Sequence, residues 1–316
     1  MPLIQVLRRC HMRGNRVLCL FLISFLLFSQ WGAISYGDDS PRSGPESLLD
    51  KYHEIEKELE KNSGPVPFYV ESSVNKNASY VDIYGTIKYP FDIVKNELLI
   101  PANWCGIVLL HPDIKACTYK KMDTWLLNIY NVNKFSKPLE AAYQMKFAYR
   151  VSGLQPEYFD IALTAHEGPS HTKDHQLGFE AIPLEKNTTF IHLRYSFGYS
   201  ALGYFLMKIF GGAKIGFSII GTDSAGNPVY AGGLRGSVER DVVCYYLAIL
   251  AYLDTLKAPS DQRFEKRIRQ WYALAARYKK QLLEMGKEEY LTYKRRDRES
   301  QQRLQGDLNS RYFGKK

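Results

Sequence analysis

Cysteine is scarce in this chain of 316 residues, which has five, two of them in its N-terminal leader. No Cys-x-x-Cys pair occurs, so the sequence disfavours a zinc ribbon and a thioredoxin-type redox site. The chain also lacks a nucleophile elbow, a phosphate-binding loop and a His-Glu-x-x-His zinc signature. The absence of these motifs leaves a catalytic function without support, although it does not exclude one.

A second long apolar run is also missing. The first, "VLCLFLISFLLF" from Val17 to Phe28, is too short to span a bilayer comfortably and follows a leader with four arginines. This pattern predicts a signal peptide over residues 1–37, cut after Gly37, where Ser35 and Gly37 are small. We therefore expect an exported, periplasmic protein, and an uncleaved N-terminal anchor is the alternative.

Strong charge of either sign is absent from the body of the protein. The formal net charge of +9 includes the four leader arginines, and most of the remainder lies in the segment 286–316. This balance gives no support for nucleic-acid binding, which an exported protein rarely needs.

Three cysteines remain after the leader: Cys105, Cys117 and Cys244. An oxidising compartment permits a disulfide, and Cys105 with Cys117 is the first pair to test. The alternative is that all three are small buried hydrophobes.

Periodicity predicts an N-terminal helix within the segment 38–78, a strand from Ser79, and a short helix led by Pro90. The following hundred residues read as antiparallel strands, each with one apolar, aromatic face. We therefore expect a sheet with one face covered by helices and the other wet, which places His192 and Arg194 at the surface.

Helical patterns follow the strands. A helix and a hairpin occupy residues 200–232, and Ser237 is expected to cap a helix that extends towards Lys257. A further helix from Asp261 carries a heptad-like apolar seam to Met285. After Gly286 the charged tail is expected to be loose.

The order of strand, proline-led helix, "IPANW", curved antiparallel sheet and long helix resembles the START-like (SRPBCC) helix-grip superfamily. The matching residues are Pro90, Phe91, Val94, Leu98 and Trp104, and the resemblance covers residues 79–257. It implies an α+β fold in which a curved sheet grips a C-terminal helix, with additional helices at both ends; residues 258–316 form a C-terminal helix and basic tail. The whole chain also resembles a group of exported proteobacterial proteins without an assigned function.

The superfamily resemblance implies a hydrophobic tunnel between sheet and helix that binds an apolar small molecule or lipid. Its expected lining is aromatic and aliphatic: Tyr143, Met145, Phe147, Tyr149, Leu193, Tyr195, Phe197, Tyr245 and Ile249. The alternative is that the same side chains pack as a solid core. Arg235 or Arg240, at the start of the gripping helix, is a candidate polar handle for an anionic group, whereas a salt-bridge role is the simpler interpretation.

The stretch "AHEGPSHTKDH" gathers His166, Glu167, His171, Asp174 and His175 within a turn. Its spacing lacks the helical pairing that aims two imidazoles at one metal, so we predict a solvated loop and no metal or other cofactor.

These patterns favour an exported protein that binds a hydrophobic small molecule or lipid, with its basic tail making weak contact with a membrane. One alternative is a non-binding structural module of the cell envelope. A second is a periplasmic enzyme acting in an apolar pocket, because relatives with this fold include cyclases that use a lone acid or base.

Overall fold

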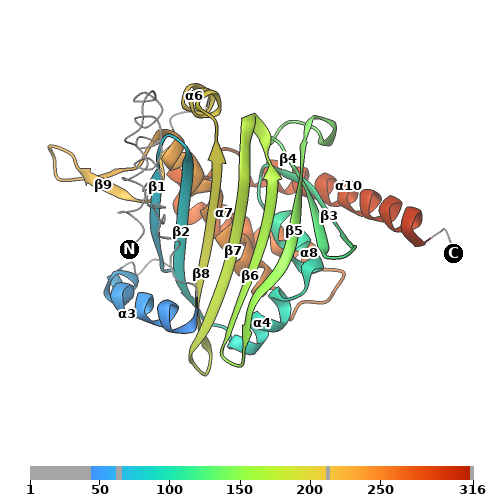
Figure 1. Ribbon diagram of the computed structural model, residues 1–316, viewed down its shortest axis with the longest axis horizontal. Helices are drawn as coiled ribbons and strands as arrows, with labels where there is room; N and C mark the ends of the chain where they lie inside the picture. The colour runs from blue at the N-terminus through green and yellow to red at the C-terminus, as the bar shows by residue number, and fades with distance from the viewer. Residues whose placement is uncertain (1–43, 62–65, 211–213, 314–316) are drawn as a thin grey trace, which may run out of the picture. The chain divides into compact units, whose positions relative to one another are not determined.

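The computed structural model describes residues 44–61, 66–210 and 214–313 (Figure 1), which belong to one unit, Ser43–Lys316. The signal peptide expected at residues 1–37 lies outside the described residues. In the described part of the chain, no helix combines the length and apolar character needed to cross a membrane.

An antiparallel sheet of eight strands forms the centre of the unit, in the order β1-β2-β8-β7-β6-β5-β4-β3. Its strands are β1 (Phe68–Val74), β2 (Ala78–Ile87), β3 (Ile114–Lys121), β4 (Trp125–Asn131), β5 (Tyr143–Gln155), β6 (Tyr158–Glu167), β7 (Thr172–Glu185) and β8 (Thr188–Tyr199). Strand β1 lies where the sequence predicted only a linker, and it extends the sheet by pairing with β2.

The helix α7 (Gly233–Leu253) crosses one face of this sheet (Figure 1) and is buried over most of its length. It packs so closely on β2 that a methyl group at Gly85 would clash with the hydroxyl group of Tyr246. The predicted α+β fold class, a curved sheet that grips a long helix, is confirmed. Ser237 is not the N-cap as predicted: the cap is Gly232, and the Ser237 hydroxyl donates to the carbonyl of Gly233.

Two short helices, α4 (Phe91–Leu98) and α5 (Pro101–Val108), connect β2 to β3, and prolines precede or open them. Trp104 of α5 is 1% exposed, and its indole nitrogen donates to the Leu98 carbonyl at 2.8 Å. A disulfide joins Cys105 of α5 to Cys117 of β3, while Cys244 is a buried free thiol. These contacts fix α5 against the end of the sheet.

The opposite face of the sheet is partly covered by α3 (Pro45–Lys61). Its apolar side packs on residues of β2, β6, β7 and β8, among them Tyr84 and Phe190. Here His192, which was expected at the surface, is 3% exposed and hydrogen-bonded to Asp82 and Glu180. The expectation of a wet outer face was therefore wrong at this position, because α3 and neighbouring side chains cover it.

The C-terminal region consists of α8 (Arg263–Ala275), η4 (Ala276–Tyr278), α9 (Lys279–Leu282) and α10 (Lys287–Phe313). The continuous heptad helix expected up to Met285 is thus interrupted after Ala275. The tail expected to be loose is mostly α10, which packs along β3 at the sheet edge. Its Gln301 and Gln305 accept hydrogen bonds from the backbone N–H groups of Cys117 and Tyr119.

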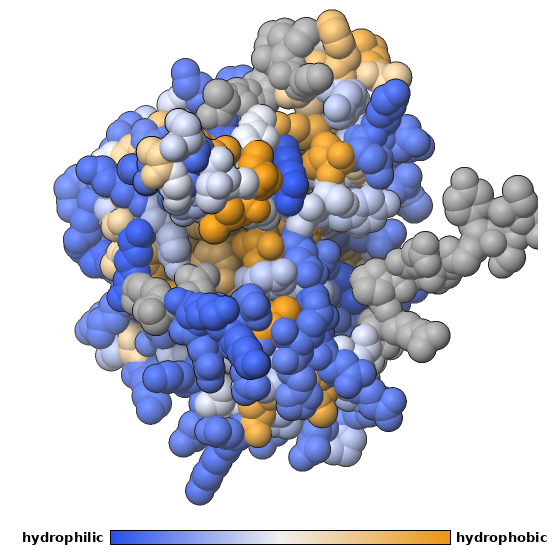
Figure 2. Space-filling view, turned by 90° about the vertical axis from the view of Figure 1, so that its left-hand side faces the viewer, coloured by the Kyte–Doolittle hydropathy of each residue, from blue (hydrophilic) through white to orange (hydrophobic). Residues whose placement is uncertain are grey.

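Between β8 and α7 lie α6 (Ala201–Phe210) and a hairpin of β9 (Ile219–Thr222) and β10 (Pro228–Tyr230). Large apolar side chains of these elements are exposed, including Leu202, Phe205, Ile219 and Ile220. Figure 2 shows apolar residues gathered at the top of the face that it presents, where α6 lies in Figure 1. The short helices η2 (Leu139–Ala141) and η3 (Pro169–His171) complete the described structure.

Candidate functional site

A cavity of about 580 Å³ lies between the sheet and α7. The side chains of its sheet wall alternate along the strands, as period two requires. Most are apolar, namely Ile129, Met145, Phe147, Leu163, Leu177 and Phe197, and the polar Asn131, Thr172, His175 and Tyr195 lie among them. Trp104 and Val108 of α5, Met207 of α6 and Val238 of α7 complete the apolar wall. Volumes of this size are typical of sites for small molecules.

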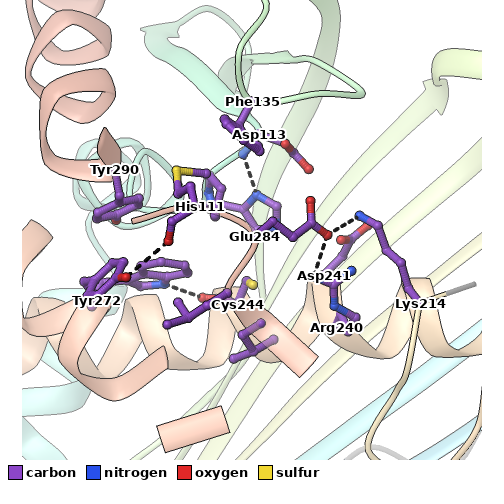
Figure 3. A pocket seen from close by; sticks show the side chains of 15 residues that line it. His111, Asp113, Phe135, Lys214, Arg240, Asp241, Cys244, Tyr272, Glu284 and Tyr290 are labelled. Atoms are coloured by element: carbon purple, nitrogen blue, oxygen red, sulfur yellow. Dashed lines mark hydrogen bonds and ion pairs between the residues drawn. The ribbon is translucent and has the colours of Figure 1, made fainter. Parts of the chain in front are cut away.

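Polar groups gather at one end of the cavity, where the α5–β3 connection faces α7. Asp241 of α7 and Asp113 both line the cavity, as do His111 and Lys214. Figure 3 shows these four side chains around a smaller adjoining pocket of about 30 Å³, which Cys244 and Tyr290 also line. The cavity therefore has a long apolar part and a confined ionisable end.

Asp241 lines the cavity and its side chain is exposed at the cavity wall. Burial and, after it, the negative charges of Asp113 and Glu284 raise the pKa of its carboxyl group to about 7 against the opposing charges of Lys214 and Arg240. Burial likewise raises the pKa of Asp113. Such a carboxyl group changes its charge near neutral pH, which few side chains do.

The cations at this end are engaged elsewhere. Lys214 contacts Glu284 at 3.1 Å and Arg240 contacts the same carboxylate at 2.7 Å (Figure 3). In the structure as described, neither Asp113 nor Asp241 has an ion pair or a hydrogen bond to its carboxylate. Two acidic side chains therefore face the cavity without a positive partner.

His111 is 3% exposed and stacks on the ring of Tyr245, with the ring centroids 4.6 Å apart. Its Nδ1 accepts a hydrogen bond from the backbone N–H of Asp113 at 3.1 Å, so the neutral ring carries its proton on Nε2. Burial, together with the charges of Lys294, Lys214 and Arg240, lowers the pKa of His111 to about 3. Its Nε2 has no hydrogen-bond partner among the described residues.

A second group of polar side chains, Thr172, His175 and Tyr195, lies on the sheet side of the cavity. The Thr172 hydroxyl donates to the Pro169 carbonyl at 2.6 Å, so it accepts from Nε2 of His175 at 2.9 Å. Nδ1 of His175 then accepts from the Tyr195 hydroxyl at 2.7 Å. Burial lowers the pKa of His175 to about 4, so this imidazole is neutral at pH 7 and its two nitrogens are satisfied.

The structure brings only some of the expected lining residues together. Five of them line the cavity: Met145, Phe147, Tyr195, Phe197 and Tyr245. Leu193 and Ile249 are fully buried in the packed core, Tyr143 is largely exposed, and the Tyr149 hydroxyl donates to the Leu99 carbonyl.

The two candidate polar handles do not reach the large cavity. Arg235 donates to Ser72 at 2.7 Å and to Glu239 at 3.2 Å, and Arg240 lines only the smaller pocket beside Glu284. In the candidate metal loop, His166 is fully exposed while His175 is buried beside Tyr195. In the part of the chain that the structure describes, no three His, Cys, Asp or Glu side chains are arranged to hold a metal ion.

Sequence reasoning missed the acidic end of the cavity. Asp241 lies three residues after Val238 and four before Tyr245, and this helical spacing puts it on the face of α7 that lines the cavity. That spacing was a usable signal. Asp113, His111 and Lys214 lie in connections, whose approach to α7 no periodicity predicts.

No protein-family model matches the chain, and no curated protein matches it either. Among solved structures, a norcoclaurine synthase from Thalictrum flavum is similar, with 10% identity, a TM-score of 0.33, and coverage of 45% of this chain and 86% of that one. A START superfamily protein from Mycobacterium smegmatis has 13% identity, a TM-score of 0.29, and coverage of 38% and 77%. A Streptomyces aromatase/cyclase has 14% identity, a TM-score of 0.30, and coverage of 64% and 94%.

At these values the similarities have no bearing on activity. The topology of this chain itself, with two short helices after β2 and α7 across the sheet, gives it a START-like helix-grip fold.

Proposed function

We propose that this chain is an exported protein that binds a hydrophobic small molecule or lipid between its sheet and α7. The observation that carries the proposal is the cavity of about 580 Å³ with apolar walls. Packed interiors rarely contain voids much larger than a water molecule, so a cavity of this size favours a bound ligand over a packed core. The cavity favours binding over the alternative of a purely structural module, which needs a filled core.

Native mass spectrometry tests this proposal. The chain is expressed with its leader and recovered from the periplasm, and its mass is recorded before and after extraction with organic solvent. A stoichiometric apolar adduct is the expected result, and the protein mass also tests the cut after Gly37. A ligand-free protein that also fails to bind the uncharged fluorescent probe diphenylhexatriene would contradict the proposal.

A cavity-filling variant gives the matched comparison. Leu163→Trp places a bulky ring at the cavity wall, whereas Leu154→Trp adds the same ring on β5 at a residue that is 59% exposed. We expect Leu163→Trp to reduce probe binding at least about tenfold, because the new ring occupies the binding volume. Leu154→Trp should bind like the wild type, and circular dichroism checks that both variants fold.

One observation favours an enzyme as the second candidate. Asp241, whose pKa is raised to about 7, could exchange a proton with a bound molecule at neutral pH. Incubating the protein with its extracted ligand and comparing ligand masses over time tests this candidate. A ligand whose mass stays unchanged after prolonged incubation with the protein favours binding alone.

A further inference from the structure

The cavity end formed by Asp113, Asp241 and His111 has an unusual charge arrangement for an apolar site. Asp241 is exposed to the cavity and Asp113 is partly exposed to it, and neither carboxylate has a partner in the described structure. A carboxylate that is partly removed from water without a partner, as Asp113 is, loses part of its solvation energy. A ligand that supplies a positive charge at this end would restore part of that energy.

The neighbouring side chains do not supply this charge. Lys214 and Arg240 share the carboxylate of Glu284, and Lys115 and Lys294 share that of Asp297. His111 is neutral at physiological pH, and Lys294 donates to the carbonyls of Leu109, His111 and Ile114. Asp113 and Asp241 are therefore the acidic groups at this end that lack an ion pair among the described residues.

His111 provides a second, independent observation at the same end. Its side chain lines the cavity and is only 3% exposed. Its Nε2–H donor has no acceptor among the described residues. A buried donor without an acceptor costs roughly 1–3 kcal/mol in general. An acceptor oxygen supplied by a ligand at this end would satisfy it.

We propose that the cavity selects amphiphiles whose polar end is a protonated amine, held by the carboxylates of Asp113 and Asp241. This inference rests on the proposed function and specifies its ligand class. The apolar body of the ligand would lie along Phe147, Leu163 and Phe197, and its ammonium group would donate charge-assisted hydrogen bonds to the two carboxylates. An oxygen near the nitrogen, as in a long-chain amino alcohol, would accept from His111.

An anionic amphiphile such as a fatty acid fits this end poorly. Its carboxylate would meet two side chains of like charge in a confined space, where water screens charge weakly. An uncharged alcohol avoids this repulsion and gains no ionic attraction. The expected order of affinity is therefore amine, then alcohol, then carboxylate.

The preference of the cavity for amines over carboxylates should depend on pH. The charged and titratable groups around Asp241 are Asp113 and Glu284, which raise its pKa, Lys214 and Arg240, which lower it, and the neutral His111. As pH rises through about 7, Asp241 loses its proton while an alkyl amine, with a pKa of about 10, stays charged. Amine affinity should thus increase between about pH 6 and pH 8, and dodecanoate affinity should decrease.

Competition against diphenylhexatriene tests the inference with dodecylamine, dodecanol and dodecanoate below their micelle concentrations. At about pH 8, we expect dodecylamine to bind at least tenfold more tightly than dodecanoate. Asp241→Asn and Asp113→Asn should each weaken dodecylamine roughly tenfold, the loss typical of one charge-assisted hydrogen bond, and leave dodecanol nearly unchanged. Asp261→Asn is the control, because Asp261 is exposed and lies outside the cavity lining.

The outcomes separate this inference from the proposed function. If diphenylhexatriene binds but dodecanoate competes as well as dodecylamine, the amine selection is wrong and apolar binding stands. Unchanged dodecylamine affinity in both Asn variants would also overturn it. If neither the probe nor any dodecyl compound binds, the proposed function fails together with the inference.

Discussion

His192 lies between two carboxylates on the sheet face that α3 partly covers. Its Nδ1 is 2.8 Å from Glu180 and its Nε2 is 2.7 Å from Asp82, while the ring stacks on Tyr84. Burial alone would lower the pKa of His192, but the hydrogen bonds to Asp82 and Glu180 outweigh it and raise the pKa. The protonated imidazole is therefore the form that this site stabilises.

Replacing His192 should destabilise the protein in a pH-dependent way. His192→Gln removes the cation between Glu180 and the partly exposed Asp82, while Arg194 and Tyr158 still contact Glu180. We therefore expect a loss smaller than the roughly 3–5 kcal/mol typical of a buried charge left without any partner. Because the folded-state pKa is raised, this contribution is fully present below about pH 6.5, the unfolded value, and is lost as pH rises through the folded pKa. Urea unfolding of both proteins between about pH 5.5 and pH 9 measures the difference.

His53→Gln is the control for this series, because His53 is exposed on α3. A difference between wild type and His192→Gln that stays constant across the pH range would contradict a charged His192.

The disulfide gives a second prediction at this scale. Cys105 and Cys117 close a loop with a sequence separation of 12. Cross-links over loops of about this length stabilise proteins by about 3 kcal/mol. The double variant Cys105→Ala and Cys117→Ala should therefore lose roughly 2–4 kcal/mol of unfolding free energy. Reductant should destabilise the wild type and leave the variant unchanged; an equal response of the two would contradict the bridge.

Residue patterns predicted which sheet face is apolar, and they could not predict where along that face the cavity lies. Met145 and Tyr149 share one side of β5, yet only Met145 lines the cavity. The Tyr149 hydroxyl instead bonds to the Leu99 carbonyl after α4, a contact between segments far apart in sequence. Cavity position depends on how helices approach the sheet, and alternation within a strand carries no information about that distance.

At the scale of elements, α10 covers the edge of the sheet at β3. Strand β3 is the last in the sheet order, so its outer backbone groups have no neighbouring strand. Gln301 accepts from the Cys117 N–H at 2.8 Å, and Gln305 accepts from the Tyr119 N–H at 2.9 Å and donates to its carbonyl at 3.1 Å. Two side chains of a helix thus replace part of a missing strand and block the edge.

The double variant Gln301→Ala and Gln305→Ala should test this role. It leaves two backbone N–H groups unpaired beneath a helix, and each unsatisfied buried group costs about 1–3 kcal/mol. We expect a loss of roughly 2–5 kcal/mol in urea unfolding and a tendency to associate through β3, visible by size-exclusion chromatography with light scattering. Gln302→Ala, at an exposed position of the same helix, is the matched control. Equal stability of the two variants would show that edge pairing adds nothing.

The sequence could not reveal this element as a docked helix. The segment after Gly286 is rich in charge and lacks an apolar stripe, so the pattern favoured a loose tail. Its attachment combines Tyr290 and Leu291, which lie in the hydrophobic core, with buried polar groups. Lys294 donates to three carbonyls near α5, and the Tyr290 hydroxyl donates to the Leu110 carbonyl at 2.7 Å. Two adjacent apolar residues make no helical period, and periodicity does not detect attachment by hydrogen bonds. Alternation predicted antiparallel strands and helical spacing predicted α7, while the resemblance to the helix-grip superfamily supplied their arrangement.

At the scale of the whole molecule, the docking of α10 changes how a membrane surface would meet the protein. Lys294 and Arg295 are engaged with Asp297 and Glu265, so they add little to the outer charge. The exposed arginines on α10 are Arg296, Arg303 and Arg311. Each basic residue near an anionic surface contributes about 1 kcal/mol at best, so contact through them would be weak and sensitive to salt.

Vesicle sedimentation of the purified protein tests this expectation. We expect partial binding to vesicles that contain an anionic phospholipid at low salt, and little binding at about 0.15 M salt, where screening acts within about 8 Å. Replacing Arg296, Arg303 and Arg311 by Gln should remove up to about 3 kcal/mol of attraction and abolish most of the low-salt binding. The control replaces three exposed lysines elsewhere, Lys57, Lys76 and Lys186, by Gln, which makes the same change in net charge. Binding that resists salt and survives the arginine replacements would contradict a charge-borne contact, and would point to the exposed apolar side chains of α6, where Leu202 and Phe205 are more than half exposed.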